Sequence, residues 1–383
     1  MLRVAISIPV VPNRGIGGME TTVAALVHSL GRLAGPEEFV LIGNRLNARW
    51  LQSLAGHNQK VVIAPKLRLT ERVYLSVDCD IVHLPIPPKR FIPFGKKMVY
   101  TVHDLLYRRH PEFYNPGPAA VLENAYRAAC ARATVIIAIS QCVKEDLIRE
   151  YSISPERITV IPWGPPTAIR PKPTPDLVKA VKAKYGLNLP FAFYPAMVHP
   201  HKNHLGLVEA IGILRDQRGL KVRVVCTGAP HQHGSWIKDR ISALHLDDQV
   251  IFLGLVPSEH IRAIYRAADF VIFPSLSEGA GVPLLEAWLE DVPVACSNVA
   301  ALAENAGDAA LKFDPTDTQA IASALSQMTT DPLLRDELRQ RGAKRLDLFN
   351  WDQVARAYRE AYYRAWRPES GLIGARMPRV SSV

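Results

Sequence analysis

Short apolar runs rich in β-branched residues alternate with helical stretches along this chain, and the alternation restarts after a proline-rich segment. This pattern is typical of parallel sheets, because parallel strands need a crossover helix between them. In the first half we predict strands at Arg3–Pro9, Phe39–Gly43, Lys60–Ala64, Ile81–Leu84, Lys97–Val102, Thr134–Ile139 and Ile158–Ile161. In the second half we predict strands at Phe191–Tyr194, Lys221–Thr227, Val250–Leu253, Phe270–Phe273, Val294–Ser297 and Ala310–Phe313. The chain therefore has an α/β pattern of two doubly wound domains.

The segment Pro162–Pro175 contains six prolines in fourteen residues and is expected to form a stiff, extended connector between the domains. In the first half, helices are predicted near Met19–Arg32, Pro118–Arg132 and Gln141–Tyr151. The expected divisions are a first domain at 1–165, a linker with a first helix at 166–185, a second domain at 186–350, a last helix at 351–366 and a tail at 367–383.

The net charge of +10 is unevenly distributed between the two halves. Residues 1–170 hold 21 Lys and Arg against 13 Asp and Glu, whereas residues 171–383 hold 25 against 23. A basic first half indicates an anionic partner such as a phospholipid surface, a lipid pyrophosphate or nucleic acid, unless the charge serves solubility alone. We expect no nucleic acid partner, because the basic first half lacks the aromatic residues interleaved with basic ones that nucleic-acid binding would need.

The cysteines and the apolar runs indicate a cytoplasmic protein. The five cysteines contain no C-x-x-C pair, which argues against a disulfide or zinc framework. Met1–Val11 lacks a cleavage site and is interpreted as a buried first strand. No apolar run reaches the roughly 18 residues of a membrane span, so any membrane contact is expected to be peripheral.

The segment Ser277–Trp288 (SEGAGVPLLEAW) follows a predicted strand and leads into a predicted helix. Glycines at such a turn allow a ligand to approach the backbone, and the free amides of a helix start attract anions. Glu278 lies before the turn and Glu286 about one turn inside the helix. This arrangement suits a ligand with a central phosphate and hydroxyls at both ends, although two solvated surface acids are the plainer interpretation.

A glycine-rich segment also follows the first strand, at Arg14–Thr22 (RGIGGMETT). Gly17 and Gly18 would open a helix whose amides face a phosphate. The segment is not a G-x-G-x-x-G fingerprint, and an ordinary tight turn is the alternative.

Two basic side chains follow strand ends, where ligand-binding residues concentrate in parallel sheets. His103 lies past the strand Lys97–Val102, and Lys202 follows the first strand of the second half. A lone histidine is more often structural, and Asp104 is expected to hold the loop. A lysine at this position can neutralise a diphosphate. Three histidines around Lys202 come from a loop without a nearby acidic ligand, so we expect them to cap and pack rather than bind metal.

Together these motifs resemble the retaining glycosyltransferases of family 4, enzymes with the GT-B fold. Glu278 and Glu286 match their E-x7-E motif, His103 and Asp104 match their His-Asp segment, and Gly17 and Gly18 match their Gly-Gly loop. The resemblance implies two Rossmann-like domains facing a central cleft, with the last helix returning to the first, acceptor-binding domain. It also implies transfer of a sugar from a nucleoside diphosphate donor, bound by the second domain, with retention at the anomeric carbon.

The resemblance assigns roles to individual residues. It implies a catalytic role for His103, Glu278 and Lys202, with Arg108 and Arg109 available to an anionic acceptor. Many family members carry an arginine where Met197 stands here, which leaves the second phosphate charge without its usual partner. The residues that the resemblance places on the donor are Gly17, Gly18, Lys202, Val256, Glu278, Gly279, Ala280, Gly281, Val282 and Glu286.

Relatives with the HPHKNH variant suggest mannose from GDP-mannose, transferred to a glycan or lipid-pyrophosphate-linked acceptor in polysaccharide or lipopolysaccharide biosynthesis. A UDP-sugar donor, or a nucleotide-sugar epimerase or phosphorylase of the same fold, remains an alternative. Asp78-Cys79-Asp80 has the letters of a metal-binding Asp-x-Asp site but precedes a strand and is interpreted as a turn. We therefore expect no metal and no cofactor. We also expect a cytoplasmic location, with any membrane contact at the inner face of the cytoplasmic membrane.

Overall fold

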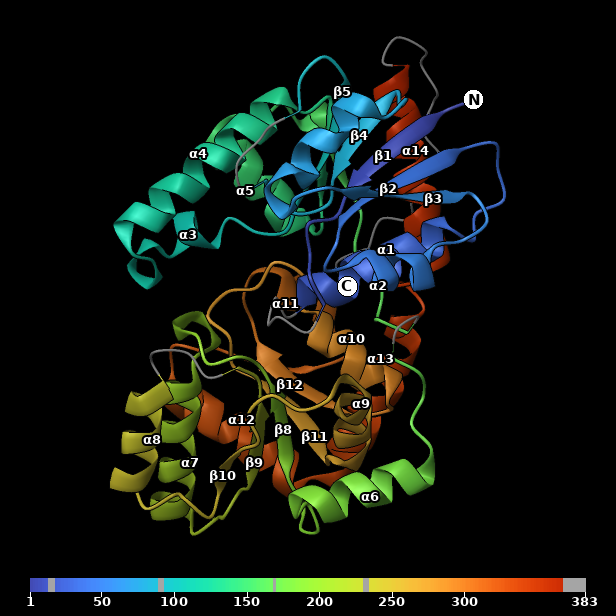
Figure 1. The fold of residues 1–383 in the computed structure, drawn as a ribbon. Coiled ribbons are helices and arrows are strands. Elements are labelled where there is room, and N and C mark those ends of the chain that lie inside the picture. Colours follow the sequence, from blue (N-terminus) through green and yellow to red (C-terminus); the bar gives the residue numbers. More distant parts are fainter. Residues whose placement is uncertain (13–17, 89–92, 168–169, 230–233, 368–383) are drawn as a thin grey trace. The chain divides into compact units, whose positions relative to one another are not determined.

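The computed structural model describes residues 1–12, 18–88, 93–167, 170–229 and 234–367. The chain divides into two compact units, one formed by residues 1–169 with 350–383 and the other by 170–349. Each contains one parallel sheet with helices packed around it (Figure 1).

The sheet of the first unit has seven strands in the order β3-β2-β1-β4-β5-β6-β7, and all neighbouring strands are parallel. Its strands are β1 (Arg3–Ser7), β2 (Glu38–Asn44), β3 (Gln59–Ala64), β4 (Ile81–Leu84), β5 (Lys97–Val102), β6 (Val135–Ala138) and β7 (Ile158–Val160). The chain builds outward from β1 to β3 and then crosses to β4, so the strand order reverses between β1 and β4.

The helices of the first unit are α1 (Gly18–Leu30), α2 (Ala48–Leu54), α3 (Leu106–Arg109), α4 (Pro116–Arg132), α5 (Gln141–Tyr151) and α14 (Trp351–Trp366). Three 3₁₀ helices accompany them, η1 (Leu67–Ser76), η2 (Pro111–Phe113) and η3 (Pro155–Arg157).

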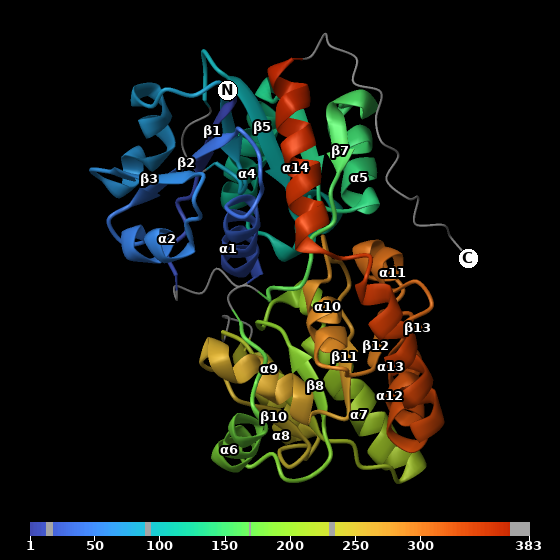
Figure 2. The same ribbon diagram turned by 90° about the vertical axis from the view of Figure 1, so that its right-hand side faces the viewer.

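Helix α14 lies against β4, β5 and β6 and beside α1, although some 190 residues separate it from β7 (Figure 2). Buried hydrogen bonds fix it to the sheet. Tyr362 Oη lies 2.9 Å from Nδ1 of His83, and Nε2 of His83 lies 2.9 Å from the hydroxyl of Thr101. The predicted return of the last helix to the first sheet is thus seen in its contacts.

The start of the proline-rich segment packs against the first unit. Trp163 is buried, and its Nε1 donates to Tyr358 Oη at 3.3 Å. Trp351 Nε1 donates to the carbonyl of Pro165 at 2.7 Å. Packing against α14 therefore incorporates the start of this segment into the first unit.

The sheet of the second unit has six parallel strands in the order β10-β9-β8-β11-β12-β13. Its strands are β8 (Ala192–Pro195), β9 (Val224–Thr227), β10 (Val250–Phe252), β11 (Phe270–Phe273), β12 (Val294–Ser297) and β13 (Leu311–Phe313). Its α-helices are α6 (Pro175–Tyr185), α7 (His204–Arg218), α8 (Gly234–Ala243), α9 (Ser258–Ala267), α10 (Val282–Leu289), α11 (Ala300–Ala306), α12 (Thr318–Thr330) and α13 (Pro332–Leu346), and η4 (Pro200–Lys202) is a 3₁₀ helix.

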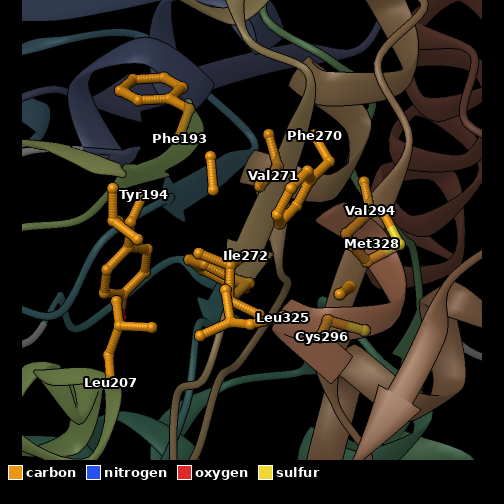
Figure 3. Close-up of a cluster of buried hydrophobic side chains, with 14 of the residues drawn as sticks. Phe193, Tyr194, Leu207, Phe270, Val271, Ile272, Val294, Cys296, Leu325 and Met328 are labelled. Carbon is orange, nitrogen blue, oxygen red and sulfur yellow. The ribbon is translucent and has the colours of Figure 1, made fainter. Parts of the chain in front are cut away.

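The core of the second unit forms where its central strands meet α7 and α12 (Figure 3). Phe193 and Ile272 come from adjacent strands, and Leu207 and Leu325 come from the two helices. Each is nearly or fully inaccessible to solvent. This packing holds β8 and β11, and hence the loops that follow them, in fixed positions.

All five cysteines are free, as their spacing predicts. Among the helices that the structure describes, none is both long enough and apolar enough to cross a membrane.

Acidification should destabilise the first unit through His83. Burial lowers the pKa of this ring to about 3, whereas an unfolded histidine titrates near 6.5. Between these values the unfolded chain binds more protons, so the free energy of unfolding should fall as pH drops below about 6.5, by up to about 1.4 kcal/mol per pH unit. Chemical denaturation between pH 7.5 and 5 measures this slope.

His83→Gln should flatten the slope, while the same change at the exposed His57 should leave it intact. A slope that is equal in all three proteins would contradict the assignment.

Candidate functional site

The loops that follow β8 and β11 lie at the point where the strand order of the second sheet reverses. From β8 the chain proceeds to β9 and β10 on one side, and β11 starts the other side. Open parallel sheets bind ligands at the carboxyl ends of their strands at such a point. Lys202 lies in the loop after β8 and Glu278 in the loop after β11, so the predicted residues lie at the expected edge of the sheet.

Lys202 and Glu278 form an ion pair across this point. Their side chains are 15% and 11% exposed. The Nζ atom of Lys202 also lies 5.3 Å from the ring centre of Phe273, at the end of β11. The buried hydroxyl of Tyr194 donates to the carbonyl of Lys202, which fixes the loop from below. A cation and an anion are thereby held together with little contact with water.

The turn before α10 places backbone amides beside this pair. Gly281 is the N-cap of α10 with φ 64°, and a Cβ atom there would lie 2.8 Å from Leu302 Cδ2. The positive φ therefore favours glycine, and any larger residue would also require the Leu302 side chain to shift. Asn305 Nδ2 donates to the carbonyl of Ala280, which fixes the peptide before it. The turn leads into a helix start, whose free amides and dipole favour an anion.

Glu286 lies in the second turn of α10 and is 8% exposed. Its Oε1 forms an ion pair with Nη1 of Arg170, and its Oε2 accepts a hydrogen bond of 2.8 Å from the hydroxyl of Tyr265. Burial raises the pKa of Tyr265, so its hydroxyl remains protonated and acts as the donor. Glu286 is the residue predicted to bind the ribose, and both of its carboxylate oxygens are thus engaged by protein groups.

The loops after β8, β9 and β10 approach one another closely. Gly228 has φ 139°, and a Cβ atom there would lie 2.6 Å from the backbone nitrogen of Met197. Gly228 N donates to the carbonyl of Gly254 at 2.9 Å, just before Val256, which packs partly buried against the core. Met197 is 36% exposed. The position thus offers an apolar side chain where the family resemblance leads us to expect an arginine.

The histidines around Lys202 contact one another and the buried Tyr194. His199 and His201 contact each other through their Nδ1 atoms at 2.6 Å. His204 is buried beside Tyr194, with ring centres 4.7 Å apart, and burial lowers the pKa of its ring to about 3. Within the described residues, no three His, Cys, Asp or Glu side chains are grouped so as to hold a metal ion.

The two aspartates of the Asp78-Cys79-Asp80 segment have a structural role. Asp78 forms an ion pair with Arg3, and the Asp80 carboxylate accepts from the backbone nitrogen of Arg3 at 2.9 Å.

In the first unit, His103 follows β5 and is 6% exposed. Its Nε2 lies 2.6 Å from the carbonyl of Pro85, just after β4, and its ring meets Trp163 edge-on at 4.7 Å. Burial lowers the pKa of the ring to about 4, so His103 is neutral at pH 7. Since a carbonyl only accepts, Nε2 carries the proton and Nδ1 is left as a hydrogen-bond acceptor. Asp104 Oδ1 accepts from Leu106 N at 3.0 Å, which confirms that it holds the loop.

The arginines predicted to meet an anionic acceptor already have carboxylate partners on α5. Arg108 pairs with Glu150 at 3.1 Å, and Arg109 pairs with Asp146 at 2.7 Å. Their acceptor role stays a prediction. Of the glycine loop, Gly17 lies outside the described residues, and Gly18 opens α1 with open space where a Cβ atom would lie.

Within the second unit, the structure brings together the loop of Lys202, the turn from Glu278 to Val282, and Glu286. Sequence reasoning missed the partners that hold them, namely Arg170, Tyr265 and Asn305. The only signal for Tyr265 is a polar hydroxyl on the buried side of the amphipathic helix α9. Arg170 and Asn305 carry no recognisable signal in the sequence.

Two families match successive parts of the chain. The family described as Glycosyltransferase Family 4 matches residues 16–168, and the family described as Glycosyl transferases group 1 matches residues 179–345. Between them they cover most of the chain.

Similar proteins are known as both sequences and structures. The chain is 27% identical over 277 residues to the O-antigen chain mannosyltransferase B of Escherichia coli, covering 72% of each. It is 28% identical over 274 residues to the E. coli serotype-specific mannosyltransferase WbdA, covering 70% of this chain but only 33% of WbdA. The crystal structure of Anabaena Alr3699/HepE with UDP and glucose is similar with a TM-score of 0.74 at 17% identity, covering 95% of this chain and 100% of that one.

Proposed function

Because this chain belongs to the glycosyltransferases of group 1 and family 4 and has their GT-B fold, we propose that it transfers mannose from GDP-mannose with retention of the anomeric configuration. The acceptor in this proposal is a glycan or a lipid-pyrophosphate-linked glycan of a surface polysaccharide. The relatives named O-antigen mannosyltransferases support this choice of sugar and acceptor.

The observation that carries the proposal is the Lys202–Glu278 ion pair at the reversal point of the second sheet, beside the start of α10. A cation and helix amides suit the diphosphate, and a carboxylate suits the hydroxyls of the sugar. We assign Glu278 to the sugar, Glu286 to the ribose, and the backbone around Val256 to the base. The amides from Gly279 to Val282 and the Gly17–Gly18 loop are assigned to the phosphates.

In the proposed reaction, the bond between the anomeric carbon and the phosphate oxygen breaks, and a bond to the acceptor oxygen forms on the same face of the sugar. The acceptor hydroxyl gives its proton to the departing phosphate oxygen. Negative charge grows on the diphosphate, where Lys202 and the dipole of α10 stabilise it. These groups supply the positive charge without a metal ion, and no cofactor takes part.

His103 is assigned to a hydroxyl of the donor sugar. Its Nε2 donates to Pro85, so its Nδ1 lone pair is the atom that can accept from the sugar. A neutral ring suits this task, because a charged imidazolium would oppose the positive charge that develops at the anomeric carbon. Arg108 and Arg109 remain candidates for an anionic acceptor, provided that they exchange their present carboxylate partners.

A UDP-sugar donor is the second candidate, because the structurally similar HepE was crystallised with UDP and glucose. The mechanism above is unchanged by that choice, since the base lies apart from the reacting bond. For either donor we propose a cytoplasmic location, with the basic first half facing anionic lipid at the membrane surface.

The proposal is tested by thermal unfolding of the full chain with GDP, UDP, ADP or CMP, with and without EDTA. A nucleotide at about 100 times its Kd should stabilise the protein by roughly 2.7 kcal/mol. We expect GDP to raise the melting temperature and EDTA to leave the rise unchanged. Stabilisation by UDP alone would change the donor, and no response to any nucleotide would contradict the proposed function.

His103→Ala should lower turnover of GDP-mannose by at least about tenfold, since a hydrogen bond to the reacting sugar is lost, while GDP affinity stays within about twofold. Release of GDP measures turnover and calorimetry measures affinity. His110→Ala is the matched control, because His110 contacts only the exposed Glu112 and the ring of Phe113. Full activity of the His103 variant would remove this residue from the site.

A further inference from the structure

Arg170 is the first residue of the second unit, and its guanidinium lies on the carboxylate assigned to the ribose. Nη1 pairs with Oε1 of Glu286, and Nε lies 3.3 Å from the hydroxyl of Ser258 at the start of α9. The side chains of Arg170 and Glu286 are 17% and 10% exposed. A guanidinium thus lies between the start of α9 and the second turn of α10.

A diol that binds Glu286 meets a protein partner on each carboxylate oxygen. Its Oε2 accepts from Tyr265, which is buried and cannot withdraw without disturbing the core. Its Oε1 is held by Arg170, a long and flexible side chain. The two hydroxyls of a ribose need acceptor lone pairs on the carboxylate at the same time. Of the two present partners, Arg170 is therefore the one that a nucleoside can displace.

The backbone of Arg170 is fixed, although its side chain can move. Its carbonyl accepts a hydrogen bond from Nη1 of Arg262, whose Nε pairs with the buried Glu290. The side-chain contact to Ser258 is long, and Ser258 is exposed. Rotation of the side chain therefore breaks its contacts to Glu286 and Ser258 and leaves the hydrogen bond of the Arg170 carbonyl intact.

We propose that Arg170 is an internal competitor of the donor nucleoside, which binds Glu286 in place of the ribose and thereby lowers the affinity of the protein for its nucleotide. The inference rests on the proposed function, because it needs a nucleoside at Glu286. When Arg170 is displaced, it stays tethered beside the site and can recapture Glu286 as the nucleotide leaves. Arg170 thus sets nucleotide affinity and release and is not a catalytic residue.

The size of the effect follows from the fraction of molecules in which Glu286 is free. Apparent affinity falls by that fraction, so a pair that is open in about one molecule in ten weakens binding about tenfold. The competition concerns the nucleoside and not the phosphates. It should therefore lower the affinity for guanosine and GDP but leave the affinity for inorganic pyrophosphate unchanged.

Calorimetric titration of the full-length protein with GDP, guanosine and inorganic pyrophosphate tests this. Arg170→Ala and Arg170→Gln should bind GDP and guanosine about threefold to tenfold more tightly than the wild type, with pyrophosphate affinity unchanged. Ser258→Ala should give a smaller gain, because it removes the contact to Nε without altering Glu286. Arg218→Ala, which changes an arginine bound to Ser323 in the same unit, should leave all three affinities unchanged.

A second readout keeps the proposal testable if loss of Arg170 weakens the fold. In a Glu286→Gln background, Arg170→Ala should no longer change guanosine affinity, because the contested carboxylate is gone. Unchanged or weaker guanosine binding by both Arg170 variants would overturn the inference. Weaker pyrophosphate binding would also overturn it, because Arg170 would then be a phosphate ligand. If the wild type binds none of the nucleotides GDP, UDP, ADP and CMP, the proposed function itself fails.

Discussion

The ion pair between Lys202 and Glu278 is the interaction on which the candidate site depends. Charged groups with so little exposure are costly to bury alone, and removal of either one leaves the other uncompensated. The pair joins loops from two adjacent strands, β8 and β11, whose relative position is set by the core beneath them. A substrate phosphate that binds Lys202, or a sugar that binds Glu278, therefore exchanges one electrostatic partner for another.

A second carboxylate is paired in the same way in the second turn of α10, where Glu286 is held by Arg170 and Tyr265. Each carboxylate that the sequence assigns to the donor is thus already neutralised by a cation of the same unit. Such pairing compensates the charge of the acidic groups in a largely buried site without fixing them permanently. It also gives the protein a way to set nucleotide affinity through groups that touch no reacting atom.

Most of the fold could be predicted from the sequence, because parallel strands that are buried on both faces give continuous apolar runs. Four strands have the bounds that the sequence predicts, namely Ile81–Leu84, Lys97–Val102, Phe270–Phe273 and Val294–Ser297. The predicted strand Lys221–Thr227 starts too early, since pairing with β8 begins only at Val224. The helix α13 gave little signal, because only Leu338 and Gly342 are buried in its fifteen residues. Packing of Trp163 against α14 likewise depends on distant residues that the local composition does not reveal.

The candidate site, like the fold, could be predicted from the sequence only in part. Lys202, Glu278 and the Gly281 turn could be found because each is tied to a strand end or a helix start that the sequence shows. Arg170 lies 116 positions before Glu286, and only the folded chain makes them partners. The carboxylates that hold Arg108 and Arg109 come from α5, for which the sequence predicts a helix and no partner of these arginines. Local patterns thus locate ligand-binding loops, whereas the charges that meet there are set by tertiary contacts.

The central claim is that the Lys202–Glu278 pair receives a nucleoside diphosphate, and calorimetric titration of GDP tests it most directly. Lys202→Ala, and the double variant Lys202→Ala/Glu278→Gln that leaves no unpaired carboxylate, should bind GDP at least about tenfold more weakly than the wild type. Lys221→Ala, at an exposed lysine before β9, should bind it normally. Equal GDP affinity in all four proteins would contradict the account.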